Sequence, residues 1–447
     1  MRYINLSNLN AVQTSFHGGI AIKLAPHSIS FRPGLTKRVF EELGAMNQIT
    51  FSRLFPQGYK PGLFTFGEHP HIGEAANIVE RYRDAFVRGI VNPGQIAEFN
   101  LYSRLIEAKD LSRHSDITIA EVMGKLARSI FGDSVDQFKG PNEKADRIGR
   151  ELVSILPKDM SWKDWMVTLS ASNALELFST KPKWDYLIDD IRRVSENPGN
   201  FKLGLDASDL FIERVISRPQ KIAFFPDNFG EVRFDLQFLL KLAEHYEKIS
   251  PDGDWTISVV PKSVPSTTDA TYTLIDNIIN EENSSVAGLK RIIDKGKFKV
   301  FDDGPKAQGT FAPHLSQEIG NYLVDLIEND GTAIAKGLYN LESIQGLNIP
   351  IFMFFKSKTD RSSKASGLNK DEFGLAYLPP TVKGVEGFLK DKPDYTFSDL
   401  LNTVKSDKYQ SILTSFSGNE RSAVNFIHNF MEQHHCTFVE AVDRINI

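Results

Sequence analysis

The sequence predicts an α/β protein with a doubly wound, largely parallel sheet, a Rossmann-like three-layer fold that follows a mainly helical N-terminal subdomain. Two observations predict this class. From about residue 218 to residue 380, short apolar runs alternate with segments in which apolar residues recur at helical spacing. From about residue 72 to residue 215, helical spacing dominates. Strands that alternate with helices are typical of parallel sheets, because each helix returns the chain to the same edge of the sheet.

The elements can be assigned in chain order. Strands are predicted over residues 221–227, 255–262, 298–304, 332–337, 349–356 and 374–380, with helices between them over 231–249, 269–280 and 316–329. Before the strands we expect a mixed segment over residues 1–60 and helices over 74–90, from about Asp116, over 141–156 and from Ser161 through Phe178. The tail returns to helices, with Thr396 and Asp399 at capping-box spacing. The predicted parts are residues 1–215, a mixed segment and helical subdomain, residues 216–380, an α/β core, and residues 381–447, a helical extension.

The composition is that of an ordinary globular protein. Of 447 residues, 41% are hydrophobic and 24% are charged, and the formal net charge is −5. A mildly acidic chain without a concentrated basic face does not favour nucleic acid as a partner. Cys436 is the only cysteine, which excludes an intramolecular disulfide and a multi-cysteine zinc site. No apolar run reaches the ~18–20 residues of a membrane span and no secretory signal is evident, so we expect no membrane partner and a cytoplasmic location.

Oxygen-bearing side chains follow the first two predicted strands of the core. Asp227 and Asn228 end the first strand and Glu231 begins the next helix, while Asp269 lies in the loop after the second strand. Ligands of open parallel sheets bind beyond the carboxyl ends of the strands. Carboxylate and amide oxygens suit a hard divalent cation such as Mg²⁺. Spacing alone does not separate this interpretation from the alternative that these residues only cap helices.

Basic side chains follow the later strands. Lys336 ends the fourth strand, with Gly337 and Asn340 after it, and Lys356 and Lys358 stand two residues apart at the end of the fifth. An ammonium group and an amide beside a helix N-terminus suit a phosphate. A structural carboxylate is the alternative partner for a lysine at a buried strand end. An acidic and a basic cluster at one sheet edge together favour metal-assisted phosphoryl transfer.

Several segments resemble the sequence blocks of the damage-control phosphatases, a family of metal-dependent carbohydrate-phosphate phosphatases of which one branch was also described as a protein-glutamate methyltransferase. FFPDNFGEVRF resembles the Asp-Asn-x-Gly-Glu signature, PSTTDAT the next block, AKGLYNLE the Lys-Gly-x-x-Asn-x-Glu block, and IFMFFKSKTD a strand that carries a lysine. These four blocks stand in the right order over about residues 218–360. LSASNALELF is similar to a helical Gly-Asn-x-x-Asp block, with Ser172 and Glu176 in place of its Gly and Asp.

The resemblance implies a role for each matching residue. The metal ligands would be Asp227, Asn228 and Asp269. The catalytic residues would be Asp227 and Lys358, the latter stabilising the phosphate. The remaining substrate or phosphate contacts would come from Asn173, Glu231, Lys336 and Asn340. The implied cofactor is a divalent metal, either Mg, Mn, Co or Ni.

We therefore predict a metal-dependent phosphatase that hydrolyses phosphate monoesters of small phosphorylated metabolites, with sugar phosphates or related compounds as the implied substrates. The metal would activate water while a lysine stabilises the phosphate. Two alternatives stay open. One is an S-adenosylmethionine-dependent carboxyl methyltransferase, although its usual glycine-rich loop is missing after the first strand. The other is a non-catalytic binding protein on the same fold, with a protein partner engaged through the terminal extensions.

Overall fold

The structure is a computed structural model, and it describes residues 53–54, 93–107, 116–132, 136, 138–175, 185–306, 309–310, 315–344, 347–358, 363, 366–380 and 396–446. The helix predicted over residues 74–90 lies outside the described residues. Glu176 and nearly all of the mixed segment over residues 1–60 also lie outside them.

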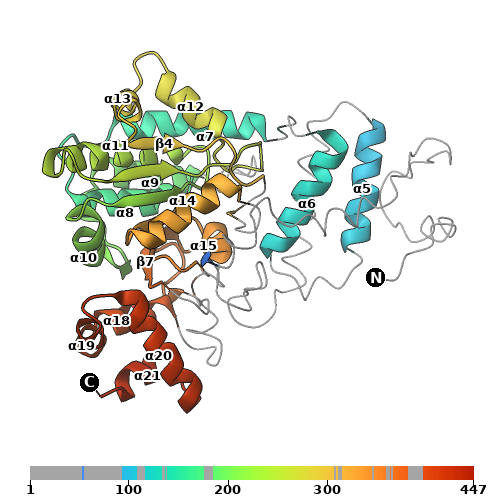
Figure 1. Cartoon of the computed structure of the whole chain (residues 1–447). Coiled ribbons are helices and arrows are strands. Elements are labelled where there is room, and N and C mark those ends of the chain that lie inside the picture. Colours follow the sequence, from blue (N-terminus) through green and yellow to red (C-terminus); the bar gives the residue numbers. More distant parts are fainter. Residues whose placement is uncertain are drawn as a thin grey trace.

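In the described part of the chain, seven strands form one sheet (Figure 1). They are β1 (Leu205–Asp206), β2 (Lys221–Phe225), β3 (Thr256–Val259), β4 (Phe298–Val300), β5 (Thr332–Lys336), β6 (Ile351–Lys356) and β7 (Phe373–Leu378). The spatial order is β1-β7-β6-β5-β2-β3-β4, and the strands from β6 to β4 are all parallel. Strand β7 pairs antiparallel with β6, and β1 runs parallel to β7. The predicted fold class, α/β with a largely parallel, doubly wound sheet, is confirmed.

The strand sequences explain why this sheet lies inside the molecule. Every residue of β5 and β6 is buried. Mainly apolar runs of this kind, which end in a lysine in both strands, fit strands that are covered on both faces, whereas a half-exposed strand would alternate between apolar and polar residues. The ring of Phe211 illustrates the packing, since it lies edge-on to Phe352 and Phe354 of β6 with centroids 4.9 and 5.5 Å away.

Helices precede, connect and follow the strands. Before β2 come α5 (Pro93–Glu107), α6 (Asp116–Phe131), α7 (Lys139–Ser154), α8 (Trp162–Ser172), α9 (Asp185–Glu196), a 3₁₀ turn (Pro198–Asn200), α10 (Ser208–Phe211) and a π-helical segment (Ile212–Ile216). The later connections carry α11 (Val232–Ile249), α12 (Tyr272–Asn280), α13 (Gly288–Asp294), α14 (Gln317–Glu328) and α15 (Leu338–Ile344). The C-terminal extension holds α18 (Phe397–Lys405), α19 (Asp407–Ser415), α20 (Glu420–His434) and α21 (Phe438–Arg444). The predicted capping box of Thr396 and Asp399 starts α18. Among the described helices, none has the length and apolar character needed to cross a bilayer.

Helix α8 begins where the sequence predicts but ends earlier. Ser161 is its N-cap and forms a capping box, as its place before the helix predicts. The prediction that the helix continues through Phe178 is wrong, because α8 ends at Ser172 and Asn173 is its C-cap. The amide of Leu175 bonds the carbonyl of Ser172 at 2.9 Å, a three-residue spacing that tightens the chain out of the α-helix. The early end leaves Asn173 at the edge of the sheet.

The C-terminal extension packs against the antiparallel side of the sheet, where α18 contacts β7 (Figure 1). A buried polar cluster holds it there. Glu420 of α20 accepts hydrogen bonds from Arg214, from Tyr377 of β7 and from Tyr409 of α19. Burial raises the pKa of both tyrosines well above the usual value, so both stay neutral donors. One hydrophobic core joins the helices before the sheet, the sheet and the C-terminal helices.

Candidate active site

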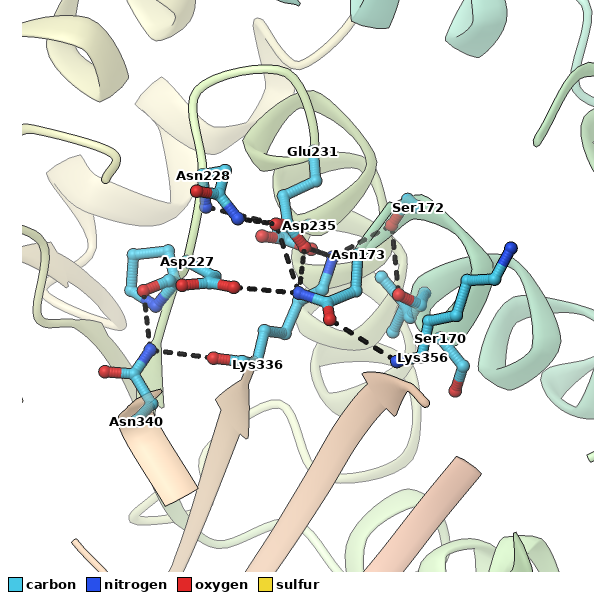
Figure 2. A network of polar contacts seen from close by, with 12 residues as sticks. Ser170, Ser172, Asn173, Asp227, Asn228, Glu231, Asp235, Lys336, Asn340 and Lys356 are labelled. Carbon is cyan, nitrogen blue, oxygen red and sulfur yellow. Dashed lines mark hydrogen bonds and ion pairs between the residues drawn. The ribbon is translucent and has the colours of Figure 1, made fainter. Parts of the chain in front are cut away.

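The strand order reverses at one place in the sheet. From β2 the chain passes to β3 and β4 on one side, then returns to β5, which neighbours β2 on its other side, and continues to β6. In open α/β sheets, ligands bind in the crevice beyond such a reversal. Asp227 and Asn228 follow β2, Lys336 ends β5 and Asp269 follows β3. Asp227, Asn228 and Lys336 therefore flank the switch point, Asp269 lies after the neighbouring strand β3, and Figure 2 shows part of this group.

Two turns carry the candidate ligands and are paired with each other. Asn228, after β2, and Asp269, after β3, form an isolated antiparallel bridge. The amide of Ala270 donates to the carbonyl oxygen of Asp227 at 2.7 Å, and the hydroxyl of Thr268 donates to Asn228 Oδ1 at 2.6 Å. All of these side chains are buried, and Asp227 retains an exposure of 8%. The three predicted metal ligands therefore lie on neighbouring backbone segments.

Asn173 links the helical part of the chain to the turn after β2. Its amide nitrogen donates to Asp227 Oδ2 at 2.8 Å and lies 3.2 and 3.3 Å from the two carboxylate oxygens of Glu231. Its amide oxygen accepts the backbone N–H of Lys356 at 3.4 Å. Figure 2 shows Asn173 between the two carboxylates. A neutral amide in this place orients the Asp227 carboxylate without adding a charge to the site.

Glu231 and Lys336 form a buried ion pair beside the same turn. The Oε1 atom of Glu231 accepts the backbone and side-chain amides of Asn228 at 3.1 and 2.7 Å. Its Oε2 atom lies 2.6 Å from the Lys336 ammonium. Lys336 also donates to Asp235 Oδ1 and to Ser172 Oγ, each at 2.8 Å. An ammonium has three donors, and here all three are directed at protein oxygens.

Burial governs the protonation of this group. It raises the pKa of Asp235 to about 7, an effect that the nearby Lys336 ammonium opposes. For Lys336, burial alone would lower the pKa, but the carboxylates of Asp235 and Glu231 together outweigh it and the pKa is raised. Lys336 therefore stays charged, while Asp235 changes its protonation near neutral pH.

A second buried lysine accompanies Asp269. The ammonium of Lys262 lies 3.4 Å from Asp269 Oδ2, and both side chains are 2% exposed. Lys262 also donates to the carbonyl oxygen of Gly309, whose amide donates to Asp269 Oδ2 at 3.1 Å. The Thr267 hydroxyl lies 3.3 Å from Asp269 Oδ1. Protein groups thus hold both carboxylate oxygens of Asp269.

Asn340 and Lys358 are the two predicted site residues that come last in the chain. Asn340 Nδ2 donates to the carbonyl oxygens of Pro226 and Lys336 at 3.0 and 2.8 Å, and its Oδ1 accepts the Thr310 hydroxyl at 2.7 Å. Asn340 therefore ties the ends of β2 and β5 together. Lys358 is partly buried and lies two residues beyond the end of β6.

The ammonium of Lys356 points away from Asp227 (Figure 2). It lies 3.7 Å from Asp190 Oδ2 and 3.6 Å from Asp371 Oδ1. The sequence left two kinds of partner open for lysines at strand ends, a phosphate or a structural carboxylate. Lys356 and Lys336 both have structural carboxylates as partners.

Sequence reasoning missed Asp235 and Lys262 as members of this group. Asp235 stands one turn after Glu231 in α11, between the apolar residues Phe234 and Leu236, and a carboxylate on a buried helix face signals a partner. Lys262 follows β3 as Lys336 ends β5, so the strand-end rule that found one lysine applied equally to the other.

The chemistry of the donor set suits a hard divalent cation. Within the described residues, no three His, Cys, Asp or Glu side chains converge as a metal site. The candidate ligands Asp227, Asn228 and Asp269 include only two carboxylates, because the third side-chain oxygen comes from the Asn228 amide. Mg²⁺ accepts amide oxygens alongside carboxylates and waters. The buried charged side chains of the group are Asp227, Glu231, Asp235, Asp269, Lys262 and Lys336. Carboxylates outnumber ammonium groups by two, or by one when Asp235 is protonated, and a bound cation would offset this buried negative charge.

Gly337 allows the end of β5 to approach Asp227. Its φ is +80°, in the left-handed region that favours glycine. A β-carbon at this position would overlap the Asp227 carboxylate. Both the backbone angle and the available space therefore require glycine here.

Replacing Gly337 with alanine is expected to displace Asp227 and weaken cation binding, in addition to costing about 1–2 kcal/mol in backbone strain. Gly296→Ala is the matched control, because Gly296 also has a positive φ, +69°, but no heavy atom within 4 Å of its β-carbon position. Calorimetric titration with Mn²⁺ and thermal melts of both variants check this. Equal Mn²⁺ affinities in the two variants would contradict the role given to the close approach.

Fold and site together define an α/β protein with an oxygen-lined candidate cation site at its topological switch point. The chain belongs to the damage-control phosphatase family, because the profile of the damage-control phosphatase ARMT1-like domain matches residues 141–372. This span contains all the predicted site residues. Membership supports a metal-dependent phosphatase in the broad sense.

The fold also resembles a solved structure. It is similar to the crystal structure of a DUF89 family protein from Pyrococcus horikoshii, with a TM-score of 0.52 and 19% sequence identity. The similarity covers 70% of this chain and 100% of that chain. No curated protein matches the sequence.

Proposed function

We propose that this protein hydrolyses phosphate monoesters of small metabolites, with sugar phosphates as the substrate class, and that it uses a divalent cation held by Asp227, Asn228 and Asp269. The observation that carries the proposal is the backbone pairing of the two ligand-bearing turns at the switch point. The family match supports the phosphatase class. The choice of sugar phosphates rests on the family resemblance alone.

Each part of the reaction has a candidate in the site. A divalent cation at this position, either Mg²⁺, Mn²⁺, Co²⁺ or Ni²⁺, would neutralise phosphate oxygens and lower the pKa of a bound water. Asn173 would keep the Asp227 carboxylate oriented through its 2.8 Å hydrogen bond. Lys358 would stabilise the negative charge that develops on the phosphate. Hydrolysis breaks the P–O ester bond, the water oxygen joins phosphorus, and a proton passes to the leaving alcohol.

Three other predicted residues would position the candidate ligands and the strands that carry them. Lys336 directs its donors at Glu231, Asp235 and Ser172, so we propose that it positions Glu231 rather than contacting the phosphate. Glu231 in turn fixes the turn after β2 through the two amides of Asn228. Asn340 would hold the ends of β2 and β5 at their separation.

Removal of the metal is expected to abolish hydrolysis. Protein treated with EDTA and then desalted should release phosphate from sugar phosphates at the background rate, because no cation would neutralise the phosphate oxygens or lower the pKa of a bound water. Adding Mg²⁺, Mn²⁺, Co²⁺ or Ni²⁺ singly should restore the rate, which a phosphate-release assay measures. Hydrolysis that persists in EDTA would refute the metal-dependent mechanism.

The same preparation separates the two alternatives. Titration with S-adenosylmethionine should give no binding heat, and transfer of a methyl group without phosphate release would favour the methyltransferase. A non-catalytic binding protein would show neither phosphate release nor a thermal shift with any of the four cations.

A further inference from the structure

We infer that helix α7 sets the relative position of the two ligand-bearing turns, and that Asn142 is the positioning residue that fixes the turn before Asp269. The inference rests on the proposed cation site. It concerns residues that lie outside the ligand set and hold it through backbone contacts. The buried residues of α7 form one face at spacings of three and four: Asn142, Ala145, Gly149 and Leu152.

One part of this face supports the turn after β2. A β-carbon on Gly149 would overlap the carbonyl oxygen of Gly230, which lies between Asn228 and Glu231 in that turn. A β-carbon on Gly230 would in turn lie 2.9 Å from the carbonyl oxygen of Ala145. Helix and turn therefore meet backbone to backbone, so that a shift of α7 would shift the turn.

The other part of the face holds the turn after β3. Asn142 Nδ2 donates to the carbonyl oxygen of Thr267 at 3.0 Å, and both residues are buried. Asn142 Oδ1 has no hydrogen-bond partner among the described residues. The buried amide therefore bonds through its donor side, to the carbonyl of this turn and to the carboxylate of Asp136.

Thr267, whose carbonyl oxygen accepts the Asn142 amide, has an unusual backbone conformation. Thr267 has a φ of +53°, which a β-branched residue rarely adopts. It lies inside a turn that the amide of Asp269 closes on the carbonyl of Ser266 at 3.1 Å. A strained residue persists only where its surroundings hold it. Asn142 supplies a bond to the carbonyl of that residue, two positions before the candidate ligand Asp269.

The two turns also contact each other, so that α7 acts on one connected unit. The amide of Phe229 donates to the carbonyl oxygen of Thr268 at 2.9 Å, and Thr268 bonds Asn228 through its hydroxyl. If the Thr267 turn relaxed to a negative φ, these contacts and the Asp269 carboxylate would move together. Asn142 therefore stabilises the arrangement of ligands before any cation binds.

Asn142→Ala tests this inference, with Glu143→Ala as the matched control on the exposed face of the same helix, where the Glu143 side chain is 63% exposed. We expect Asn142→Ala to raise the Mn²⁺ dissociation constant about tenfold, as changes in groups that orient metal ligands do. In metal-free protein we expect faster hydrogen exchange at the amides of Asp269 and Phe229. Glu143→Ala should leave both readouts unchanged. Thr267→Gly in the Asn142→Ala background should recover Mn²⁺ affinity, because glycine adopts a positive φ without strain.

The outcomes distinguish this inference from the proposed function. If Asn142→Ala binds Mn²⁺ and exchanges its amides as the wild type does, α7 does not position the turns. A wild-type protein that binds no Mn²⁺ would overturn the proposed function, while exchange in metal-free protein would still decide whether Asn142 fixes the turn. Should Asn142→Ala fail to fold, Asn142→Ser takes its place, because the shorter side chain removes the Nδ2 amide that bonds Thr267 while it keeps a polar group at the buried position, and both readouts should change in the same direction.

Discussion

Asp227→Ala should eliminate phosphate-ester hydrolysis while the fold survives. The variant loses a candidate ligand and the acceptor of the Asn173 amide at once. A cation contributes several kcal/mol to the stabilisation of transition-state charge, so we expect kcat/KM to fall about a thousandfold or more. Phosphate release at saturating Mn²⁺ measures the rate, and far-ultraviolet circular dichroism checks the fold.

Stability separates this loss from simple unfolding. Asp227 lies among other buried carboxylates, so its removal lowers charge repulsion, which offsets the lost bond from Asn173, and the Tm of the metal-free protein should change little. Asp252→Ala, at an exposed position, is the control and should retain full activity. If Asp227→Ala retained more than about a tenth of the wild-type rate, a metal-assisted mechanism at this site would be excluded.

Lys336→Met should produce the largest loss of stability. The substitution keeps most of the length of the side chain but leaves Glu231 and Asp235 buried without their shared counter-charge. Removing one partner of a buried ion pair costs about 3–5 kcal/mol. Chemical denaturation of the metal-free protein measures the difference. Lys295→Met is the control, because its ion pair with Glu247 is at the surface and should contribute less than about 1 kcal/mol.

The pH dependence of this loss has a defined sign. Because the pKa of Asp235 in the folded state, about 7, lies above that of an unfolded aspartate near ~4, the folded protein binds more protons across this window. The stability contribution of Asp235 is therefore present below ~4 and falls as the pH rises toward 7. Without Lys336 the pKa rises further, so Lys336→Met should lose most stability at neutral pH and less near ~5. Adding Asp235→Asn should recover part of the loss. A loss that is the same at both pH values would contradict the assignment.

The sequence predicted the fold well because the patterns that indicate strands and helices are local. Buried strands such as β5 and β6 are mainly apolar runs between turns, and helical spacing fills the connections. The antiparallel direction of β7 was not predictable, since it depends on how the chain returns across the sheet and leaves no periodic mark. The early end of α8 was also missed, because an interaction with residues far along the chain accompanies the turn at Asn173.

The sequence predicted which residues of the candidate site lie close together, but not which groups each of them contacts. Asp227, Asp269 and Lys336 were expected to lie close together because each stands at or after the end of a parallel strand, and parallel strands end at the same edge of the sheet. Their partners come from separate elements, as Ser172 and Asp235 do for Lys336. Such pairs depend on tertiary packing, and a single sequence carries only the hint of a charged residue where the pattern is otherwise apolar.

The Glu420 cluster has a consequence for where this protein can be divided. The family match ends at residue 372, whereas Tyr377, Tyr409 and Glu420 all lie beyond it and enclose Arg214. A fragment trimmed to residues 141–372 would lack the Glu420 carboxylate that neutralises this guanidinium. It would also lack β7, so that apolar side chains packed against that strand, such as Phe352 of β6, would be exposed to water. It should therefore self-associate, because an uncovered apolar surface favours aggregation. We therefore expect the stable folding unit of this chain to extend beyond the end of the family match, at least to Glu420.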